Sequence, residues 1–359
     1  MITKADKTPR KRYLELDALR GFAAVFVMLF HYTEGKNAPE FFTLGVTGVD
    51  LFFLISGFVI FMSINKVASG SEFVINRVAR LYPTYWASVT FTFGVIVLLK
   101  MVHFNMNHAR EVSFADYLVN LTMFQYYFNI KDIDVPYWTM IIEMLFYLLI
   151  LALYHLKLLR HIVLIGCIIN GLIIINYILI NQGILPNYTG YFPLMNHFAL
   201  FLGGIIFYKI VTDTIEKPTG YLVVIFCLLT QTIIFKFTGS NPAHITFMQY
   251  ACMLVFYFMM FVFFINNKLK FIISKPALFL GRISFALYLI HNFVFRGLIG
   301  YMENHFHLPY WFAAIFIAVP LVIILAYLIT EYIEKPFGKR FKNAMHHIIE
   351  GYRLNSQRG

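Results

Sequence analysis

The sequence predicts an all-α, polytopic integral membrane protein with about ten transmembrane helices in a single domain, residues 1–359. The chain is 60% hydrophobic, 18% aromatic and 13% charged, with a mean hydropathy of +0.70, a composition foreign to soluble domains. Apolar runs long enough to cross a bilayer recur along most of its length. We place the ten spans at residues 16–34, 44–64, 82–103, 137–156, 161–180, 193–211, 219–236, 246–266, 277–297 and 310–331.

The basic residues orient this bundle. If the N-terminus is cytoplasmic, the outer segments hold only six of the 29 Lys and Arg residues, namely Lys36, Lys100, Arg110, Lys131, Lys236 and Arg296. Basic residues favour the cytoplasmic side. We therefore expect an even number of spans in the cell (inner or plasma) membrane, a basic cytoplasmic N-terminus at about 1–15, and a short basic cytoplasmic tail at about 335–359. The net charge of +11 then reflects topology, and we expect no nucleic-acid partner.

The first span carries ionisable side chains along one face. Ten residues separate Arg20 from His31, so the two lie close to three helical turns, or roughly 16 Å, apart on one face. Asp17 precedes Arg20 by three residues, and Glu34 follows His31 by three. Ionisable groups inside a span are costly unless they face a protein interior. This span is therefore predicted to be a retained helix that builds a site, and not a cleaved signal peptide.

The rest of the chain holds three further local patterns: a long loop, a glycine pair and three cysteines. The longest loop, about 104–136, is too short for a second domain. Apolar residues repeat there at helical spacing from Ser113 to Phe128, which fits an amphipathic helix on the outer membrane surface or an ordinary connecting helix. Gly203 and Gly204 predict a close approach of helices. The three cysteines show no metal or disulfide spacing, and we expect no metal and no permanently bound cofactor.

Four arginines fall near the cytoplasmic ends of the spans: Arg20, Arg77, Arg80 and Arg282. Arg77 and Arg80 are three residues apart and share a helix face. Guanidinium donors match the oxygens of a phosphate group bidentately. The four arginines could therefore hold a phosphate-bearing cytoplasmic ligand, or they could serve only as topology signals.

A second group of ionisable residues falls in the outer half of the spans, at His31, Asp50, Glu143 and His291. Histidines and carboxylates that face a membrane interior usually mark a pathway or a catalytic centre. His31 is the candidate general base, because an ordinary imidazole titrates near neutral pH. Glu143 or Glu34 could orient its ring. His291, taken alone, is as readily a structural hydrogen-bonding residue.

Several motifs, in order along the chain, resemble the acyltransferase-3 family of membrane acyltransferases. They are LDALRG at 16–21 with His31, GVDLFFLISGF at 48–58, RVARLYP at 77–83, WTMIIEMLFY at 138–147, GRIS at 281–284 with YLIH at 288–291, and EKPF at 334–337. The resemblance covers almost the whole chain. One departure is Ala18, where the family often has Gly.

The resemblance implies an enzyme that takes an acyl group, usually acetyl, from acyl-coenzyme A in the cytoplasm. The acceptor would be a hydroxyl of a surface glycan such as lipopolysaccharide, or of a lipid-linked saccharide, at the outer face of the cell envelope. It implies that Arg20 and His31 are the family's Arg and His of the first span, and that Arg77 and Arg80 are its paired arginines. Direct transfer and a route through an acylated protein both fit. Some members carry a fused periplasmic esterase-like domain, which we do not expect here.

Three other functions fit parts of this pattern. A transporter or flippase of a lipid-linked sugar would show inverted repeats, which are not visible in the sequence. A different membrane O-acyltransferase fold would also use a histidine, but it would not explain the Arg20–His31 spacing or the Arg77 and Arg80 pair. A non-catalytic scaffold is disfavoured by the cost of the buried charges. The sequence gives no indication of an oligomeric state.

Overall fold

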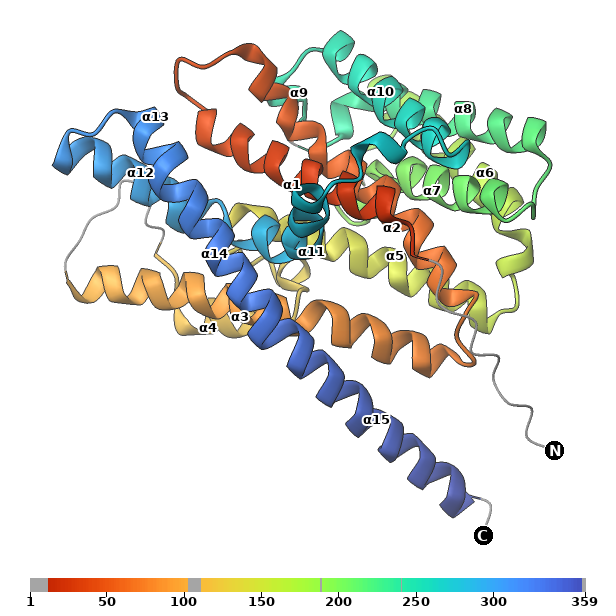
Figure 1. Cartoon of the computed structure of the whole chain (residues 1–359). Coiled ribbons are helices and arrows are strands. Elements are labelled where there is room, and N and C mark those ends of the chain that lie inside the picture. Colours follow the sequence, from red (N-terminus) through yellow and green to blue (C-terminus); the bar gives the residue numbers. More distant parts are fainter. Residues whose placement is uncertain (1–11, 103–110, 188, 240, 357–359) are drawn as a thin grey trace.

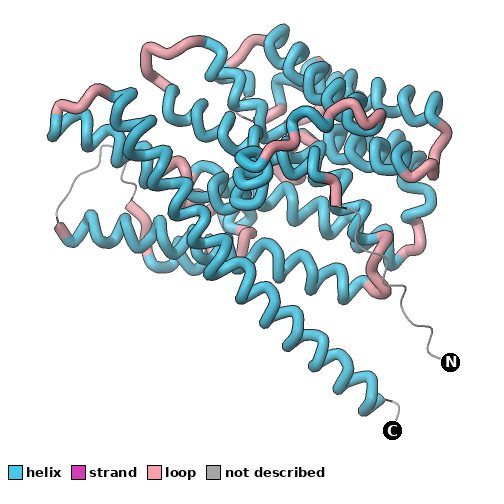
Figure 2. Tube along the Cα trace, viewed as in Figure 1, coloured by secondary structure: helices cyan, strands magenta, loops and turns pink. Residues whose placement is uncertain are grey.

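The computed structural model describes residues 12–102, 111–187, 189–239 and 241–356, with side chains as far as Met345. Every regular element in this part of the chain is a helix (Figure 1), and loops join the helices without any strand (Figure 2). The predicted all-α class is therefore confirmed.

The longer helices pack as a bundle. They are α1 (Leu14–Thr33), α2 (Gly48–Ile64), α3 (Gly70–Met101), α5 (Trp138–His155), α6 (Ile162–Asn181), α7 (Phe198–Val211), α8 (Lys217–Ile233), α10 (Phe247–Ile265), α11 (Lys275–Ile290), α12 (Phe293–Phe306), α14 (Val319–Ile329) and α15 (Lys335–Ser356). Shorter helical pieces are η1 (Glu40–Thr47), α4 (Phe114–Asn120), η2 (Gln125–Phe128), η3 (Val135–Tyr137), η4 (Leu159–His161), η5 (Pro193–Asn196), η6 (Phe235–Phe237), α9 (Asn241–His244), η7 (Lys270–Ile272), α13 (Tyr310–Phe312), and the π-helical η8 (Ala313–Ala318) and η9 (Thr330–Glu334).

The number of membrane-spanning helices is lower than predicted. Among the described residues, six helices are long and apolar enough to cross a membrane, or seven if the bent pair α11 and α12 forms one span. The expected spans at 193–211 and 219–236 are the helices α7 and α8, of only 14 and 17 residues. The span expected at 277–297 is bent by 75°, and α1, not among the six, carries three charged residues in its first two turns. Apolar runs in the sequence do not reveal where a helix ends or bends, so they overestimate the number of helices of full spanning length.

Glycines set the close approach of the central helices. The most extensive helix contacts join α1 to α11 and α2 to α7. A Cβ atom on Gly281 of α11 would lie 2.0 Å from the carbonyl oxygen of Asp17 on α1. A Cβ atom on Gly204 of α7 would lie 2.1 Å from the carbonyl oxygen of Leu54 on α2. The predicted close approach is confirmed, because small residues let helix backbones touch.

Gly204→Ala tests this packing. The added methyl group meets backbone rather than a movable side chain, so we expect a destabilisation of about 1–3 kcal/mol and a lower melting temperature of the purified protein in detergent. Gly171→Ala on α6 is the matched control: no atom lies within 4 Å of its added Cβ, and the better helix former should leave stability unchanged or slightly higher. Equal melting temperatures for Gly204→Ala and the wild type would show that this contact does not limit stability.

The predicted continuous helix from Ser113 to Phe128 is wrong. It is split into α4 and η2, and Met123 between them adopts a left-handed backbone with φ of 65°. A capping box starts α4: the Ser113 hydroxyl accepts from the Asp116 N–H, and the Asp116 carboxylate accepts from the Ser113 N–H. Apolar spacing had indicated helical content here but could not reveal the intervening turn.

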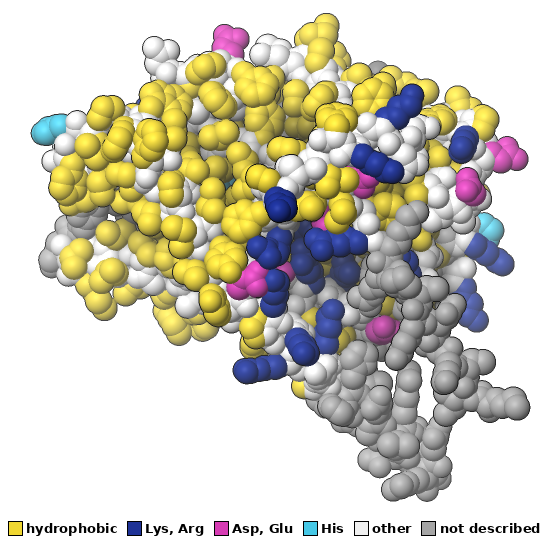
Figure 3. Space-filling view, viewed as in Figure 1, with side chains coloured by type: hydrophobic (Ala, Val, Ile, Leu, Met, Phe, Trp, Pro, Cys, Tyr) yellow, Lys and Arg dark blue, Asp and Glu magenta, His cyan; other side chains and the backbone are white. Residues whose placement is uncertain are grey.

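The ends of the described chain lie at one end of the bundle. Figure 1 shows the start of α1, the start of α3 and the projecting end of α15 on the same side, with α12 and α13 at the other. Figure 3 shows basic side chains gathered toward the side of α15, and a hydrophobic surface over the other half of the same face. That the basic side faces the cytoplasm stays a prediction from the distribution of Lys and Arg.

Candidate active site

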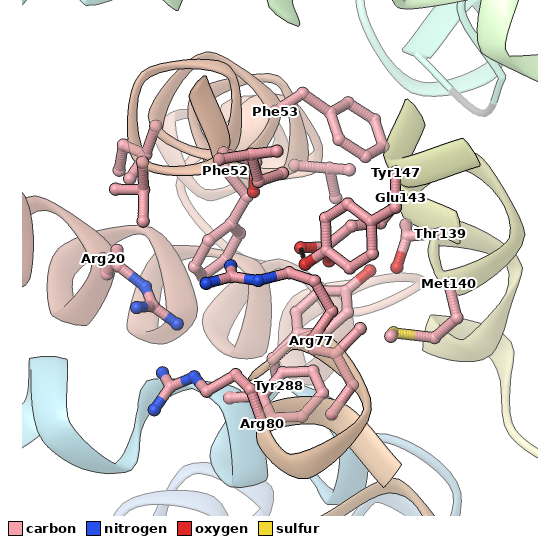
Figure 4. Close-up of a pocket in the computed structure, with 17 residues that line it drawn as sticks. Arg20, Phe52, Phe53, Arg77, Arg80, Thr139, Met140, Glu143, Tyr147 and Tyr288 are labelled. Carbon is pink, nitrogen blue, oxygen red and sulfur yellow. Dashed lines mark hydrogen bonds between the residues drawn. The ribbon is translucent and has the colours of Figure 1, made fainter. Parts of the chain in front are cut away.

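A narrow cavity of about 90 Å³ lies among α1, α2, α3, α5 and α11. Arginines from two of these helices line it, namely Arg20 on α1 and both Arg77 and Arg80 on α3. Figure 4 shows their guanidinium groups gathered at one end of the cavity. The helical spacing of Arg77 and Arg80 had predicted a shared face, and both side chains do reach this one space. We call it the arginine cavity.

The arginine cavity leaves much of the hydrogen-bonding capacity of Arg77 free. One nitrogen of its guanidinium, Nη2, donates to the Ser63 hydroxyl at 2.9 Å, and the group packs 5.7 Å from the ring centroids of Phe73 and Tyr147. The Arg77 Nε atom is buried without a hydrogen-bond partner among the described residues. A guanidinium carries five N–H donors, so a ligand that accepts several hydrogen bonds suits this position.

Glu143 lies in the arginine cavity, which the sequence did not predict. It accepts a hydrogen bond from the Tyr147 hydroxyl one turn further along α5, and Figure 4 shows both residues on the other side of the cavity from Arg20 and Arg80. The sequence had placed Glu143 beside His31 by counting from Tyr137 as though α5 began at the membrane surface. Tyr137 is fully buried, so α5 begins inside the protein and Glu143 lies deeper than expected.

A second carboxylate, Glu334, holds Arg80. Arg80 Nη1 lies 2.8 Å from Glu334 Oε1, and the Thr84 hydroxyl donates to Glu334 Oε2 at 2.9 Å. Glu334 is 8% exposed and ends the π-helical segment η9, a geometry common at functional sites. The EKPF motif contained this residue, but sequence gave it no role, because a π turn and a partner 254 positions away have no local signature.

Arg282 does not line the arginine cavity. Its Nη1 atom lies 3.5 Å from Glu331 Oε1, and Lys335 also pairs with that carboxylate at 2.5 Å. The predicted group of four arginines is therefore divided. Three converge on the cavity, and Arg282 forms a surface ion cluster with η9 nearby.

His31 and His291 lie against each other, 5.1 Å apart between ring centroids. His291 Nδ1 donates to the carbonyl oxygen of Tyr288 at 2.7 Å, because a carbonyl can only accept, and this leaves a lone pair on Nε2. His291 Nε2 and His31 Nδ1 are both buried without a partner among the described residues. Two imidazoles with open ring nitrogens form a place where a hydroxyl group can be bound and deprotonated. We call them the histidine pair.

The predicted carboxylate partners of His31 face elsewhere. Glu34 pairs with Arg296 Nη1 at 2.6 Å and lies 3.9 Å from His244 Nε2. It is therefore His291, and not Glu34, that packs against the His31 ring. Since Glu143 lies in the arginine cavity, neither carboxylate orients His31 in this structure.

Asp50 and Asp17 have structural partners. Asp50, 1% exposed, accepts from the Asn241 amide at 3.1 Å and lies 3.8 Å from His197 Nδ1. It thus joins α2 to α9 and to the start of α7, and it does not contact the histidine pair. Asp17 pairs with Arg12 Nε at 2.6 Å at the start of α1.

The structure thus brings three arginines into one cavity and sets two histidines against each other, in a bundle with helices long and apolar enough to cross a membrane. The chain belongs to the acyltransferase-3 family: the family model, described as an acyltransferase domain, matches residues 13–331. The protein is therefore an integral membrane acyltransferase.

Three relatives share parts of the sequence. "Exopolysaccharide production protein ExoZ" of Rhizobium meliloti (strain 1021) is 39% identical over 71 residues, which cover 20% of each chain. "Putative acetyltransferase ORF330" of Acidianus two-tailed virus is 24% identical over 284 residues, 76% of this chain and 80% of that protein. "Protein 2 in picA locus" of Rhizobium radiobacter is 35% identical over 88 residues, 22% of this chain and 43% of that protein. The chain thus aligns with well under two thirds of the first and third of these proteins. No solved structure matches.

Proposed function

We propose that this protein transfers an acyl group, in the simplest case acetyl, from cytoplasmic acyl-coenzyme A to a hydroxyl of an extracytoplasmic glycan or lipid-linked saccharide. The observation that carries the proposal is the layout of α1. Arg20 lines the arginine cavity, and His31, three turns further along the same helix, forms the histidine pair. The names of two relatives, "Exopolysaccharide production protein ExoZ" and "Putative acetyltransferase ORF330", support a saccharide-related role and an acetyl group.

The arginine cavity suits the donor. Coenzyme A is an anion that carries a pyrophosphate and a further phosphate, and Arg20, Arg77 and Arg80 present guanidinium forks that match such groups. Glu143 and Glu334 balance part of this positive charge before the donor binds. In this proposal Glu143 acts on the donor side, through the Tyr147 hydroxyl that it holds, and not on His31.

The histidine pair suits the transfer step. The arm of coenzyme A would follow α1 from the arginine cavity toward His31 and present its thioester there. The acceptor hydroxyl attacks the thioester carbonyl, His31 takes the hydroxyl proton, and the coenzyme A thiolate leaves and takes up a proton. The new bond is an ester and the broken bond is the thioester, so no oxidant or metal is consumed.

A transporter would use the broken span α11–α12 differently. Broken helices near the middle of a membrane can bind a transported substrate, and this bend is the one feature that favours that alternative. The chain nonetheless belongs to an acyltransferase family, and the break carries His291 into contact with His31. The bend is therefore better explained as a part of the proposed enzyme site than as a transport site.

The proposal predicts a sided reaction. In sealed vesicles of known orientation, prepared from host membranes that contain the native acceptor, labelled acetyl-coenzyme A should react only from the cytoplasmic face. The labelled product should appear in the opposite leaflet or compartment, and mass spectrometry should find an added acetyl group on a saccharide. Detergent-opened vesicles should use the donor from either side.

Vesicles made with His31→Ala protein are the control for background transfer. Label that accumulates first on the cytoplasmic face would contradict a path through the membrane. Absence of any label in acetyl-coenzyme A assays with active host membranes would contradict the proposed donor.

A further inference from the structure

A buried carboxylate outside both the arginine cavity and the histidine pair, Asp134, holds the break between α11 and α12. We propose that Asp134 is a positioning residue that keeps His291 in place against His31 by capping α12 from a distant part of the chain. The inference rests on the proposed function in one respect, that the transfer step takes place at the histidine pair.

The Asp134 carboxylate accepts one hydrogen bond from the next residue, the Val135 N–H at 2.8 Å, and its other hydrogen bonds come from the start of α12. Its carboxylate accepts from the Asn292 side-chain amide at 2.9 Å and from the Phe293 N–H at 3.1 and 3.2 Å. Phe293 is the first residue of α12, and Asn292, which precedes it, makes no side-chain cap of its own. Asp134 therefore caps the start of α12 from 159 residues away in the sequence.

No basic side chain in the described ranges forms an ion pair with this carboxylate, although Asp134 is only 2% exposed. The titratable groups that act on it or feel its charge are Asp132 and the phenols of Tyr32, Tyr137 and Tyr288, none of them cationic. Burial accordingly raises the pKa of Asp134 to about 7. Burying a carboxylate without a partner costs free energy, and the N–H groups at the helix break offset this cost by donating hydrogen bonds to it.

The segment that carries Asp134 is hydrogen-bonded to the chain on both sides of His291. Before it, the Tyr288 hydroxyl donates to the carbonyl oxygen of Pro136 at 3.3 Å, and the Tyr288 carbonyl in turn accepts from His291 Nδ1. After it, Asn292 and Phe293 donate to Asp134. His291 is thus the residue between two anchors that both come from residues 134–136.

This arrangement makes the position of His291 depend on Asp134. The bend between α11 and α12 is 75°, and His291 and Asn292 are the two residues that absorb it. If the cap is weakened, the break can relax and the His291 ring moves relative to His31. A shift of about 1 Å in a group that orients reacting atoms can cost on the order of 100-fold in rate.

The test is an exchange of the two partners. Asp134→Asn should lower kcat by on the order of 10- to 100-fold, while the KM for acetyl-coenzyme A stays within about twofold, because the arginine cavity is untouched. The double variant Asp134→Asn/Asn292→Asp restores an amide facing a carboxylate and should regain most of the lost kcat. Activity is measured with labelled acetyl-coenzyme A and host membrane vesicles that carry the native acceptor.

Asp132→Asn is the matched control, since this carboxylate lies two residues earlier and accepts from the Gln125 amide instead. It should keep near wild-type kcat.

Melting temperatures of all variants are measured in detergent. Wild-type stability should fall as the pH rises from about 4 to about 7, because the folded state retains a proton that the unfolded state releases, and Asp134→Asn should lack this dependence.

Two results would overturn the proposal. One is wild-type kcat in both Asp134→Asn and Asp134→Ala. The other is a loss of kcat that the exchanged double variant does not recover although its melting temperature is restored. If instead the wild-type protein transfers no acetyl group, the proposed function fails, and this outcome is distinct because it does not depend on any substitution at Asp134.

Discussion

His31→Ala is expected to slow acyl transfer by on the order of 10²- to 10⁴-fold, the usual contribution of a general base. The substitution should spare the fold, because His31 Nδ1 has no hydrogen-bond partner among the described residues and its loss strands no other polar group there. Affinity for acetyl-coenzyme A should change little, since His31 does not line the arginine cavity. Initial rates with labelled donor and calorimetric titration of the donor measure the two effects separately.

The matched control is His161→Ala. His161 lies outside the arginine cavity and the histidine pair, and its ring accepts from the neighbouring Arg160. This variant should keep wild-type activity. If purified His31→Ala retains more than about a third of the wild-type rate, His31 has no essential role in proton transfer.

Arg77→Ala is expected to weaken acetyl-coenzyme A binding by about 10- to 100-fold, which corresponds to the loss of one or more charge-assisted hydrogen bonds. Its side chain donates to Ser63 and also interacts with the Tyr147 hydroxyl, so the melting temperature of the variant is measured alongside its donor affinity. Arg80→Lys should also weaken binding, because an ammonium keeps the charge but loses the bidentate fork.

Arg80→Ala needs a partner substitution. Removal of the guanidinium would leave the buried carboxylate of Glu334 without its cation, which destabilises the fold in its own right. The double variant Arg80→Ala/Glu334→Gln removes the cation and the negative charge together, so its donor affinity can be measured without an unpaired buried carboxylate. Lys66→Ala, outside the arginine cavity, serves as the charge control. Unchanged donor affinity in Arg77→Ala and in the double variant would mean that these arginines only set the membrane topology.

The local features of the site followed from the sequence. The helical class follows from apolar runs, and the shared face of Arg77 and Arg80 follows from their spacing of three residues. The separation of Arg20 and His31 along α1 follows from the rise of a helix. Each of these depends only on residues within one helix, where backbone geometry is regular, and the ordered motifs then identified the family that the comparisons confirmed.

Relations between helices were decided only by the tertiary structure. Close glycine contacts pack α1 on α11 and α2 on α7 and thereby choose which faces meet. That packing brings His291 to His31, and a buried start of α5 carries Glu143 down into the arginine cavity. Glu334 and Asp134 reach partners 254 and 159 residues away. Helical period and hydropathy are properties of one segment, so they contain no information about which segments face each other.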